Sequence, residues 1–201
     1  MNLLIDPAPE SVAIAGNPTA IRTDFRIGIQ FEVLMSDRAV PDNDKLWLAL
    51  NLYYPKIPND TTAAVEQFLW FYQCGKDARR AKAGQNNPPG KSARIYDYEY
   101  DDGHIFSAFL GEYGIDLEAI EHLHWWKFKA LFSALRHDNP FCRIMQYRAQ
   151  DLAQLKGEER KHYAKMQRLY ALPIPKGEQE KNDSIAEILM NGGDLQGAKR
   201  S

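Results

Sequence analysis

The stretch HLHWWKFKALFSAL, residues 122–135, opens with two histidines, and histidine is the commonest protein ligand of transition metals. His122 and His124 are two residues apart, a spacing that on a helix turns them about 200° away from each other. Chelation from one helix face needs a spacing of three or four, so this pair could converge only in a strand or a turn. The other histidines are scattered and form no HExxH pattern: His104, His137 and His162. We therefore expect no metal site, no cofactor, and histidines that serve in the core or as helix caps.

The acid cluster YDYEYDD, residues 96–102, is the second place where chemistry could occur. Paired carboxylates can hold Mg²⁺ or act as a general acid and a general base. This cluster lacks a glycine-rich phosphate cradle, and the chain contains no GxSxG, GxGxxG or Walker pattern. Carboxylates also favour the positive end of a helix dipole and can pair with the six basic residues between 76 and 94. We expect this structural role, no catalytic residue, and hence a protein that is not an enzyme.

Basic residues interleaved with aromatics suggest a third kind of site, because such helices can grip phosphate and stack on bases. Residues 141–171 carry a net charge of +4, from seven Lys and Arg against three Asp and Glu. Asp151, Glu158 and Glu159 interrupt this charge, and the whole chain has a net charge of −2 and a pI near 6.2. No global field then attracts DNA or an anionic membrane. We expect a solvated helix face and keep a nucleic-acid-binding regulator as the third functional alternative.

Composition places the chain among globular proteins of the cell interior. Hydrophobic residues make up 44% of the 201 residues, enough for one medium domain with a packed core. The two cysteines, Cys74 and Cys142, form no CxxC pattern, so neither a disulfide framework nor a thiolate zinc site is indicated. The N-terminus has no signal-peptide pattern, and no segment approaches the roughly 18 apolar residues that a membrane span needs. We expect no membrane association and a reducing cytosol as the compartment.

The quoted stretch itself has the pattern of a core helix. An apolar residue recurs at i, i+3, i+7 and i+10, which predicts one apolar helix face: Trp125, Phe128, Phe132 and Leu135. Leu131 widens this face, and Trp126 lies on its flank, where its N–H could reach an acceptor. We therefore interpret the stretch as architecture rather than as a metal or nucleic-acid site.

Similar patterns predict further helices. Each is expected to begin at a capping residue or segment: Thr23 or Asp24, Pro41-Asp42-Asn43-Asp44, Asp60-Thr61-Thr62, Asp101 or Asp102, and Asn139-Pro140. Glycines at 75 and 114 supply two helix ends, and a last helix spans roughly 156–171. In the second helix the inward stripe is expected to comprise Leu46, Trp47, Leu50, Tyr53 and Tyr54. The predicted fold class is mainly α, a multi-helix globular domain with a small N-terminal β-hairpin.

The N-terminal hairpin is expected to pair residues 3–5 with residues 12–15 through a turn at Asp6–Pro9, with a third short strand at 19–21. A single hairpin is marginally stable alone, so it should pack on something larger. The chain then divides into three parts: a hairpin over 1–22 packed on the main domain, a helical domain over 23–172 with a mobile basic loop at 76–94, and a flexible C-terminal tail over 173–201.

Several motifs resemble one known family when they are taken in order. They are SVAIAG, DFRIGIQFEVLMSD, FYQCGK, YDYEYDDGHIFSAFLGEYGIDL, LHWWKFKALFSAL and IMQYRAQDL with a closing YAL. Together they resemble the bacteriophage gene product 15 family over about residues 1–172, with LHWWKF and YGIDL as the most specific parts. The basic loop at 76–94 and the tail after Pro173 depart from the family pattern, and specificity for a partner could differ there.

The resemblance implies a siphophage tail-assembly chaperone, encoded ahead of the tape-measure gene and working in the cytoplasm of the bacterial host. Such a protein would bind the tape-measure protein, keep this long helical client soluble and help recruit the major tail-tube protein. The resemblance brings no catalytic residues. A structural tail or connector component of the virion is the second functional alternative, and self-association into a homo-oligomer is left open.

A chaperone for an amphipathic helix needs an apolar groove with charges on its rim. Helix-wheel position assigns flanking aromatic side chains to the groove and basic ones to carboxylates of the client. The predicted partner-binding residues are Trp126, Lys127, Arg143, Tyr147 and Arg148.

Overall fold

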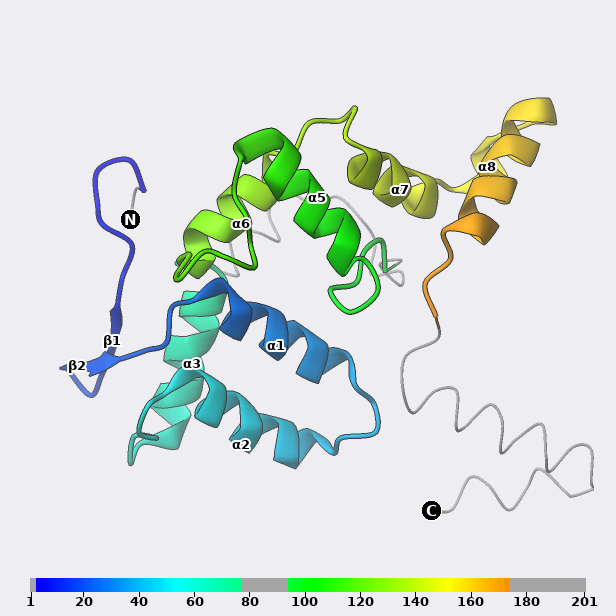
Figure 1. Cartoon of the computed structure of the whole chain (residues 1–201). Coiled ribbons are helices and arrows are strands. Elements are labelled where there is room, and N and C mark those ends of the chain that lie inside the picture. The colour runs from blue at the N-terminus through cyan, green and yellow to red at the C-terminus, as the bar shows by residue number, and fades with distance from the viewer. Residues whose placement is uncertain (1–2, 77–93, 174–201) are drawn as a thin grey trace, which may run out of the picture.

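The computed structural model describes residues 3–76 and 94–173, and within them the chain is mainly α-helical with a small N-terminal hairpin (Figure 1). The hairpin joins β1 (Ser11–Ile14) and β2 (Asn17–Ala20). The helices are α1 (Phe25–Ser36), α2 (Asp42–Tyr53), α3 (Thr61–Tyr72), α5 (Asp102–Tyr113), α6 (Trp125–Ser133), α7 (Pro140–Ala149) and α8 (Gly157–Leu169), with the short 3-10 helix η1 (Leu152–Gln154) before α8. This confirms the predicted fold class. The predicted mobile loop at 76–94, except for its end residues, and the predicted tail, except for residue 173, lie outside the described residues.

The hairpin has a different register from the predicted one. Its strands pair Ser11 with Ala20 and Ile14 with Asn17, and its two-residue turn is Ala15-Gly16. Both turn residues have positive φ, the backbone that matches the twist of a tight hairpin. The prediction of a turn at Asp6–Pro9 is wrong, as is the predicted strand at 3–5, whereas the predicted strands at 12–15 and 19–21 lie within one or two residues of β1 and β2. The two prolines between 6 and 9 cannot donate to a strand ladder, so the chain there runs as an irregular segment.

Side-chain caps fix the start of three helices where the sequence predicts them. Asp24 accepts a hydrogen bond from the N–H of Arg26 (3.1 Å), and Asp60 accepts one from the N–H of Ala63 (3.0 Å). Asn139 caps α7 in the same way, with Pro140 at the first helical position. These caps satisfy backbone donors that have no partner inside the helix.

The core is centred on α6, as the apolar spacing predicts. Trp125 and Phe128 are fully buried, and the ring of Phe128 stacks on Phe25 of α1 (5.0 Å between centroids) and on Phe109 of α5 (4.9 Å). A Cβ at Gly28 would lie 2.3 Å from the ring of Trp125. Glycine at this position therefore lets the backbone of α1 approach that ring directly, and any side chain there would force the two helices apart.

The helices pack in a sequence of neighbours rather than around one axis. In Figure 1 α1, α2 and α3 lie below α5 and α6, and α8 stands at the far end beyond α7. α1 packs against α2 and α6, β1 packs against α3, and α7 joins α5 to α8. The helices at the edges of the fold therefore pack against only one or a few neighbouring elements each.

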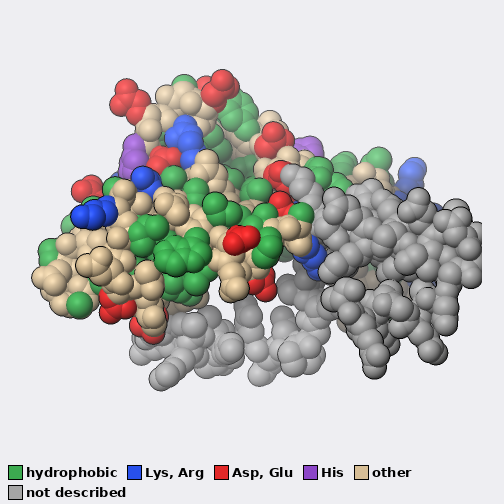
Figure 2. Space-filling model, turned by 90° about the horizontal axis from the view of Figure 1, so that it is seen from below, with side chains coloured by type: hydrophobic (Ala, Val, Ile, Leu, Met, Phe, Trp, Pro, Cys, Tyr) green, Lys and Arg blue, Asp and Glu red, His purple; other side chains and the backbone are tan. Residues whose placement is uncertain are grey.

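α2 departs from its predicted stripe. Leu50, Tyr53 and Tyr54 are buried as expected, but Trp47 keeps 53% of its surface exposed and Leu46 keeps 42%. Figure 2 views the side of the molecule on which α2 lies, and hydrophobic side chains gather on that face. The prediction that Leu46 and Trp47 face inward is wrong, because α1 and α3 cover only one side of this helix.

Candidate partner-binding groove

A groove runs along α6, first between that helix and the end of α3 and then between that helix and the irregular N-terminal segment 3–10. It consists of two hollows of about 750 Å³ and about 730 Å³ that share Leu3 and Ala130. We call these two hollows the α6 groove. Its lining includes apolar and basic side chains from three elements: Leu3, Tyr72, Lys76, Trp126, Lys127, Lys129, Ala130 and Leu131. Each hollow is within the size range of ligand pockets, so together they could take several side chains of a partner.

The rim of the α6 groove is basic on the α6 side and acidic on the N-terminal segment, where Asp6 and Glu10 line it. Lys76 and Lys127 are exposed there, whereas Lys129 is half-buried and pairs with Glu32 (3.5 Å). The ammonium group of Lys129 also lies 5.2 Å from the centre of the Trp125 ring, a cation–π contact. Lys76 and Lys127 are therefore the groove cations best placed to meet carboxylates of a partner.

His124 fastens the N-terminal segment to α6. Its Nδ1 accepts the N–H of Trp126 (3.1 Å), which makes His124 the N-cap of α6. Because Nδ1 is an acceptor, Nε2 carries the proton and donates to the carbonyl oxygen of Pro9 (3.1 Å). Burial lowers the pKa of His124 below its ordinary value of 6.5, which favours this neutral form.

The histidines do not form a metal site. Both ring nitrogens of His124 are occupied by protein groups, and His122 instead contacts the hydroxyl of Thr23 (3.1 Å). No group of three metal-binding side chains is found in residues 3–76 and 94–173. Cys74 lines the α6 groove, but burial raises the pKa of its thiol, so the reactive thiolate is disfavoured there.

Trp126 and Lys127, two of the predicted partner-binding residues, both line the α6 groove. Lys127 is exposed, but the ring of Trp126 retains only 2% of its surface and its Nε1 donates to the carbonyl oxygen of Phe71 (2.6 Å). The indole N–H of Trp126 therefore has an acceptor, as expected, and this acceptor belongs to α3. The ring of Trp126 is covered by α3, and its binding to a partner stays a prediction.

The other three predicted residues lie on α7, which packs against α5 and α8 instead of lining the groove. Arg143 is exposed, and Tyr147 is half-buried against Tyr163 and Tyr170 near α8. The structure therefore does not bring the five predicted residues together on one surface. Binding by Arg143 and Tyr147 stays a prediction.

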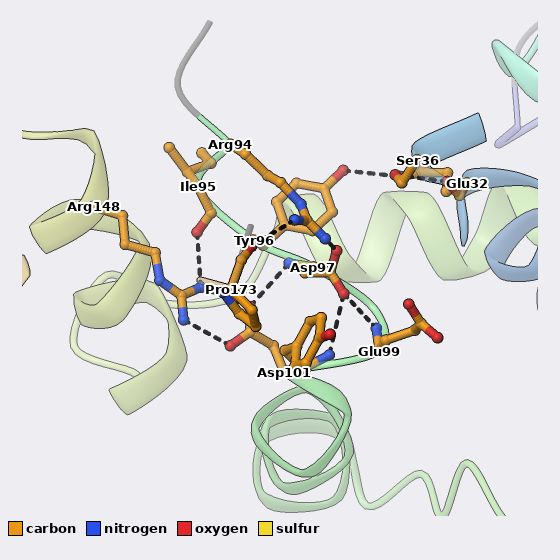
Figure 3. A network of polar contacts seen from close by, with 11 residues as sticks. Glu32, Ser36, Arg94, Ile95, Tyr96, Asp97, Glu99, Asp101, Arg148 and Pro173 are labelled. Atoms are coloured by element: carbon orange, nitrogen blue, oxygen red, sulfur yellow. Dashed lines mark hydrogen bonds and ion pairs between the residues drawn. The ribbon is translucent and has the colours of Figure 1, made fainter. Parts of the chain in front are cut away.

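Arg148 is already paired inside the protein (Figure 3). Its guanidinium binds both carboxylate oxygens of Asp101, at 2.6 and 2.9 Å, and donates to the carbonyl oxygens of Ile95 (3.1 Å) and Tyr170 (2.6 Å). Such a bidentate pair is among the strongest polar contacts in proteins. Client binding by Arg148 stays a prediction, and the structure shows that its guanidinium already has a carboxylate partner from a segment far away in the sequence.

The acid cluster at 96–102 orders the turn before α5, although Asp101 makes no side-chain cap hydrogen bond to that helix. Asp97 accepts the N–H groups of Glu99 (2.7 Å) and Tyr100 (3.1 Å) and pairs with Arg94, while Asp101 accepts the N–H of Asp97 (2.9 Å). Figure 3 shows these contacts where the segment enters α5. Asp97 and Asp101 therefore order the turn instead of forming an open pair of carboxylates.

Sequence reasoning missed the contribution of the N-terminal segment to the groove. Leu3 and the neighbouring residues were assigned to a strand, whereas Leu4 and Ile5 are largely exposed beside the groove-lining Leu3. A signal was present, because an aliphatic triplet followed by two prolines fits poorly in a paired strand.

Comparison with known proteins adds a family. Residues 4–172 match the model of the family described as Bacteriophage Gp15 protein. No curated protein and no solved structure matches the chain. Among the described helices, none is both long and apolar enough to cross a membrane.

Proposed function

The chain belongs to the Bacteriophage Gp15 protein family, and on that premise we propose that it is a tail-assembly chaperone that binds the tape-measure protein and keeps it soluble. Family membership itself supports the broader statement, a phage structural or morphogenesis protein. The finer role, including recruitment of tail-tube subunits in the host cytoplasm, is the proposal. It assigns the chain a binding role and no catalytic one.

The observation that supports this role best is the α6 groove. An amphipathic helix binds by placing its apolar face in a hydrophobic groove, with its charged flanks on the rim. Leu3, Ala130 and Leu131 offer apolar contacts, and the exposed Lys76 and Lys127 fit carboxylates on the flanks of such a helix. A long helical client with acidic flanks would satisfy both features at once.

The first experiment is co-expression with the cognate tape-measure protein, measured as the soluble fraction of the client. We expect the native chain to raise that fraction several-fold over the client alone. If it does not, the chaperone proposal is wrong.

Two variants then locate the client on the groove. Ala130→Arg fills the shared part of the two hollows, and Lys127→Glu reverses the charge of the rim; both side chains are exposed, so the fold should persist. The matched control is Lys165→Glu, an exposed lysine on α8 away from the groove. We expect the groove variants to lose most of the client-solubilising effect and the control to keep it. Equal activity of all three would mean that the client binds elsewhere.

A second measurement separates the chaperone from a structural component of the virion. A chaperone leaves when assembly is complete, so mass spectrometry of purified particles should find the tape-measure protein but not this chain. Stoichiometric presence in finished particles would favour a structural component of the tail or connector.

A further inference from the structure

The outer side of α2 carries a stripe with the spacing of a helix-pairing seam. Asp44, Trp47, Leu48 and Asn51 recur at i, i+3, i+4 and i+7, and all four are exposed. Residues at this spacing share one face of a helix and form the contact line when two helices pack together. We call them the α2 stripe. Trp47 and Leu48, at its middle, retain 53% and 46% of their surface.

The α2 stripe is symmetric about the point between Trp47 and Leu48. If a second α2 ran antiparallel to the first with a twofold axis at that point, Trp47 of each copy would face Leu48 of the other. Asp44 would then face Asn51 of the second copy at both ends. Such an isologous contact needs the same patch on both partners, and this stripe meets that condition by itself.

Charges at the two ends of α2 favour the same arrangement. The N-terminal turn carries Asp42 and Asp44. At the other end, Arg22 donates through Nη1 to the carbonyl oxygens of Asn51 (2.6 Å), Leu52 (3.0 Å) and Tyr54 (3.0 Å), which places a guanidinium beside the last turn of α2.

Antiparallel pairing brings the acidic end of each α2 close to Arg22 of the other copy, so opposite charges attract at both ends of the contact. The dipoles of the two helices then point in opposite directions, which is also favourable. A parallel pair would place carboxylates against carboxylates. We propose that the chain forms a homodimer through antiparallel pairing of the α2 stripe of two copies.

One helix per copy makes a small contact, at the low end of specific interfaces. The dimer should therefore be weak and reversible. Tryptophan is the residue most enriched among interface hot spots, and its truncation typically weakens binding by about 30-fold or more. We therefore expect Trp47 to contribute most of the binding free energy of the dimer.

Sedimentation velocity of the full chain over a concentration series tests the dimer. We expect a monomer–dimer equilibrium that Trp47→Ala weakens by about 30-fold and Trp47→Asp removes, with unchanged circular dichroism because the side chain is exposed. The matched control is Leu169→Asp, an exposed leucine on α8, which should dimerise like the native chain. A native chain that stays monomeric at concentrations of about 1 mM, or a Trp47→Asp variant that still dimerises, would overturn the proposal.

Crosslinking then tests the register. A mixture of Asp44→Cys and Asn51→Cys chains should give a covalent dimer with a short thiol-specific crosslinker, whereas Asp44→Cys alone should not. The native chain, treated in the same way, controls for Cys74 and Cys142. Crosslinking of Asp44→Cys with itself would show parallel pairing, and no crosslink in the mixture would show that another face forms the dimer. Either result contradicts the antiparallel α2 contact.

Discussion

The helices α6 and α8 look alike in one respect and are held in place in opposite ways. Both combine basic residues with aromatic ones. α6 buries all four of its aromatic side chains, mainly against α1, α3 and α5, whereas α8 has no buried residue and rests on α7 through tyrosine edges and polar contacts. Basic and aromatic content therefore does not distinguish a core helix from a peripheral one. A continuous apolar stripe does.

The largest effect should come from removing the central ring of α6. Trp125→Ala deletes a fully buried indole and its Nε1 hydrogen bond to the carbonyl oxygen of Tyr72 (2.8 Å), so we expect a loss of about 4 kcal/mol in the free energy of unfolding. Tyr163→Ala, the half-buried counterpart on α8, should cost about 1 kcal/mol. Urea denaturation of both variants measures the contrast, and equal losses would contradict it.

The next effect concerns the contact that anchors α8. Arg148→Met leaves the buried carboxylate of Asp101 without its partner, which should cost about 3 kcal/mol. It also removes the bond to the carbonyl oxygen of Tyr170, so α8 should lose protection sooner than α6. Hydrogen exchange resolved by peptide measures both helices. Faster exchange in α6 than in α8 would show that Arg148 supports the core instead.

A smaller effect is the pH dependence of stability that comes from the His124 cap of α6. Burial lowers the pKa of His124 in the folded protein below its ordinary value of 6.5, so the unfolded chain binds the proton more tightly. The stabilising contribution is complete above about pH 6.5 and is lost as the pH falls through the folded pKa. Protonation would remove the acceptor that caps α6, at a cost of about 1 kcal/mol.

The variant His124→Asn can still cap α6 but does not titrate, so its stability should fall less than that of the native chain between about pH 7.5 and about pH 5. Denaturation curves at these two pH values give the comparison. Parallel losses in the two proteins would assign the pH dependence to other groups.

The smallest effect should be a gain. The hydroxyl of Tyr53 is buried with no hydrogen-bond partner among the described residues, although its ring stacks on Phe68 (5.1 Å between centroids). Tyr53→Phe keeps the ring and removes the buried hydroxyl, so we expect stability to rise by about 0.5–1 kcal/mol. A thermal melt with a lower midpoint than that of the native chain would show that the hydroxyl has an important partner.

Local patterns predicted much of the fold. The caps at Asp24, Asp60 and Asn139 act within three residues of their own position, and the stripe from Trp125 to Leu135 needs only helical periodicity. Both kinds of signal are contained in a short stretch of sequence, so neither depends on how distant elements pack.

Long-range packing explains what the sequence did not predict about the candidate site. A helix wheel identifies a face but not the neighbour that covers it, so Leu46 and Trp47 were expected to be buried, and that expectation was wrong. The partner of Arg148 lies 47 residues earlier in the chain, a pairing that no local pattern contains. The hairpin register depends on a turn at Ala15-Gly16, whereas the prolines at 7 and 9, a more obvious turn signal, led to the wrong prediction.

The Arg148 contacts also set an order for biosynthesis. Asp101 leaves the ribosome 47 residues before Arg148, and the carbonyl of Tyr170 follows 22 residues after it. Until α7 emerges, the carboxylate of Asp101 lacks its bidentate partner Arg148 and is best left in water. The aromatic centre around α6 can therefore collapse while the nascent chain is still growing, and the seam between α5, α7 and residue 170 closes last.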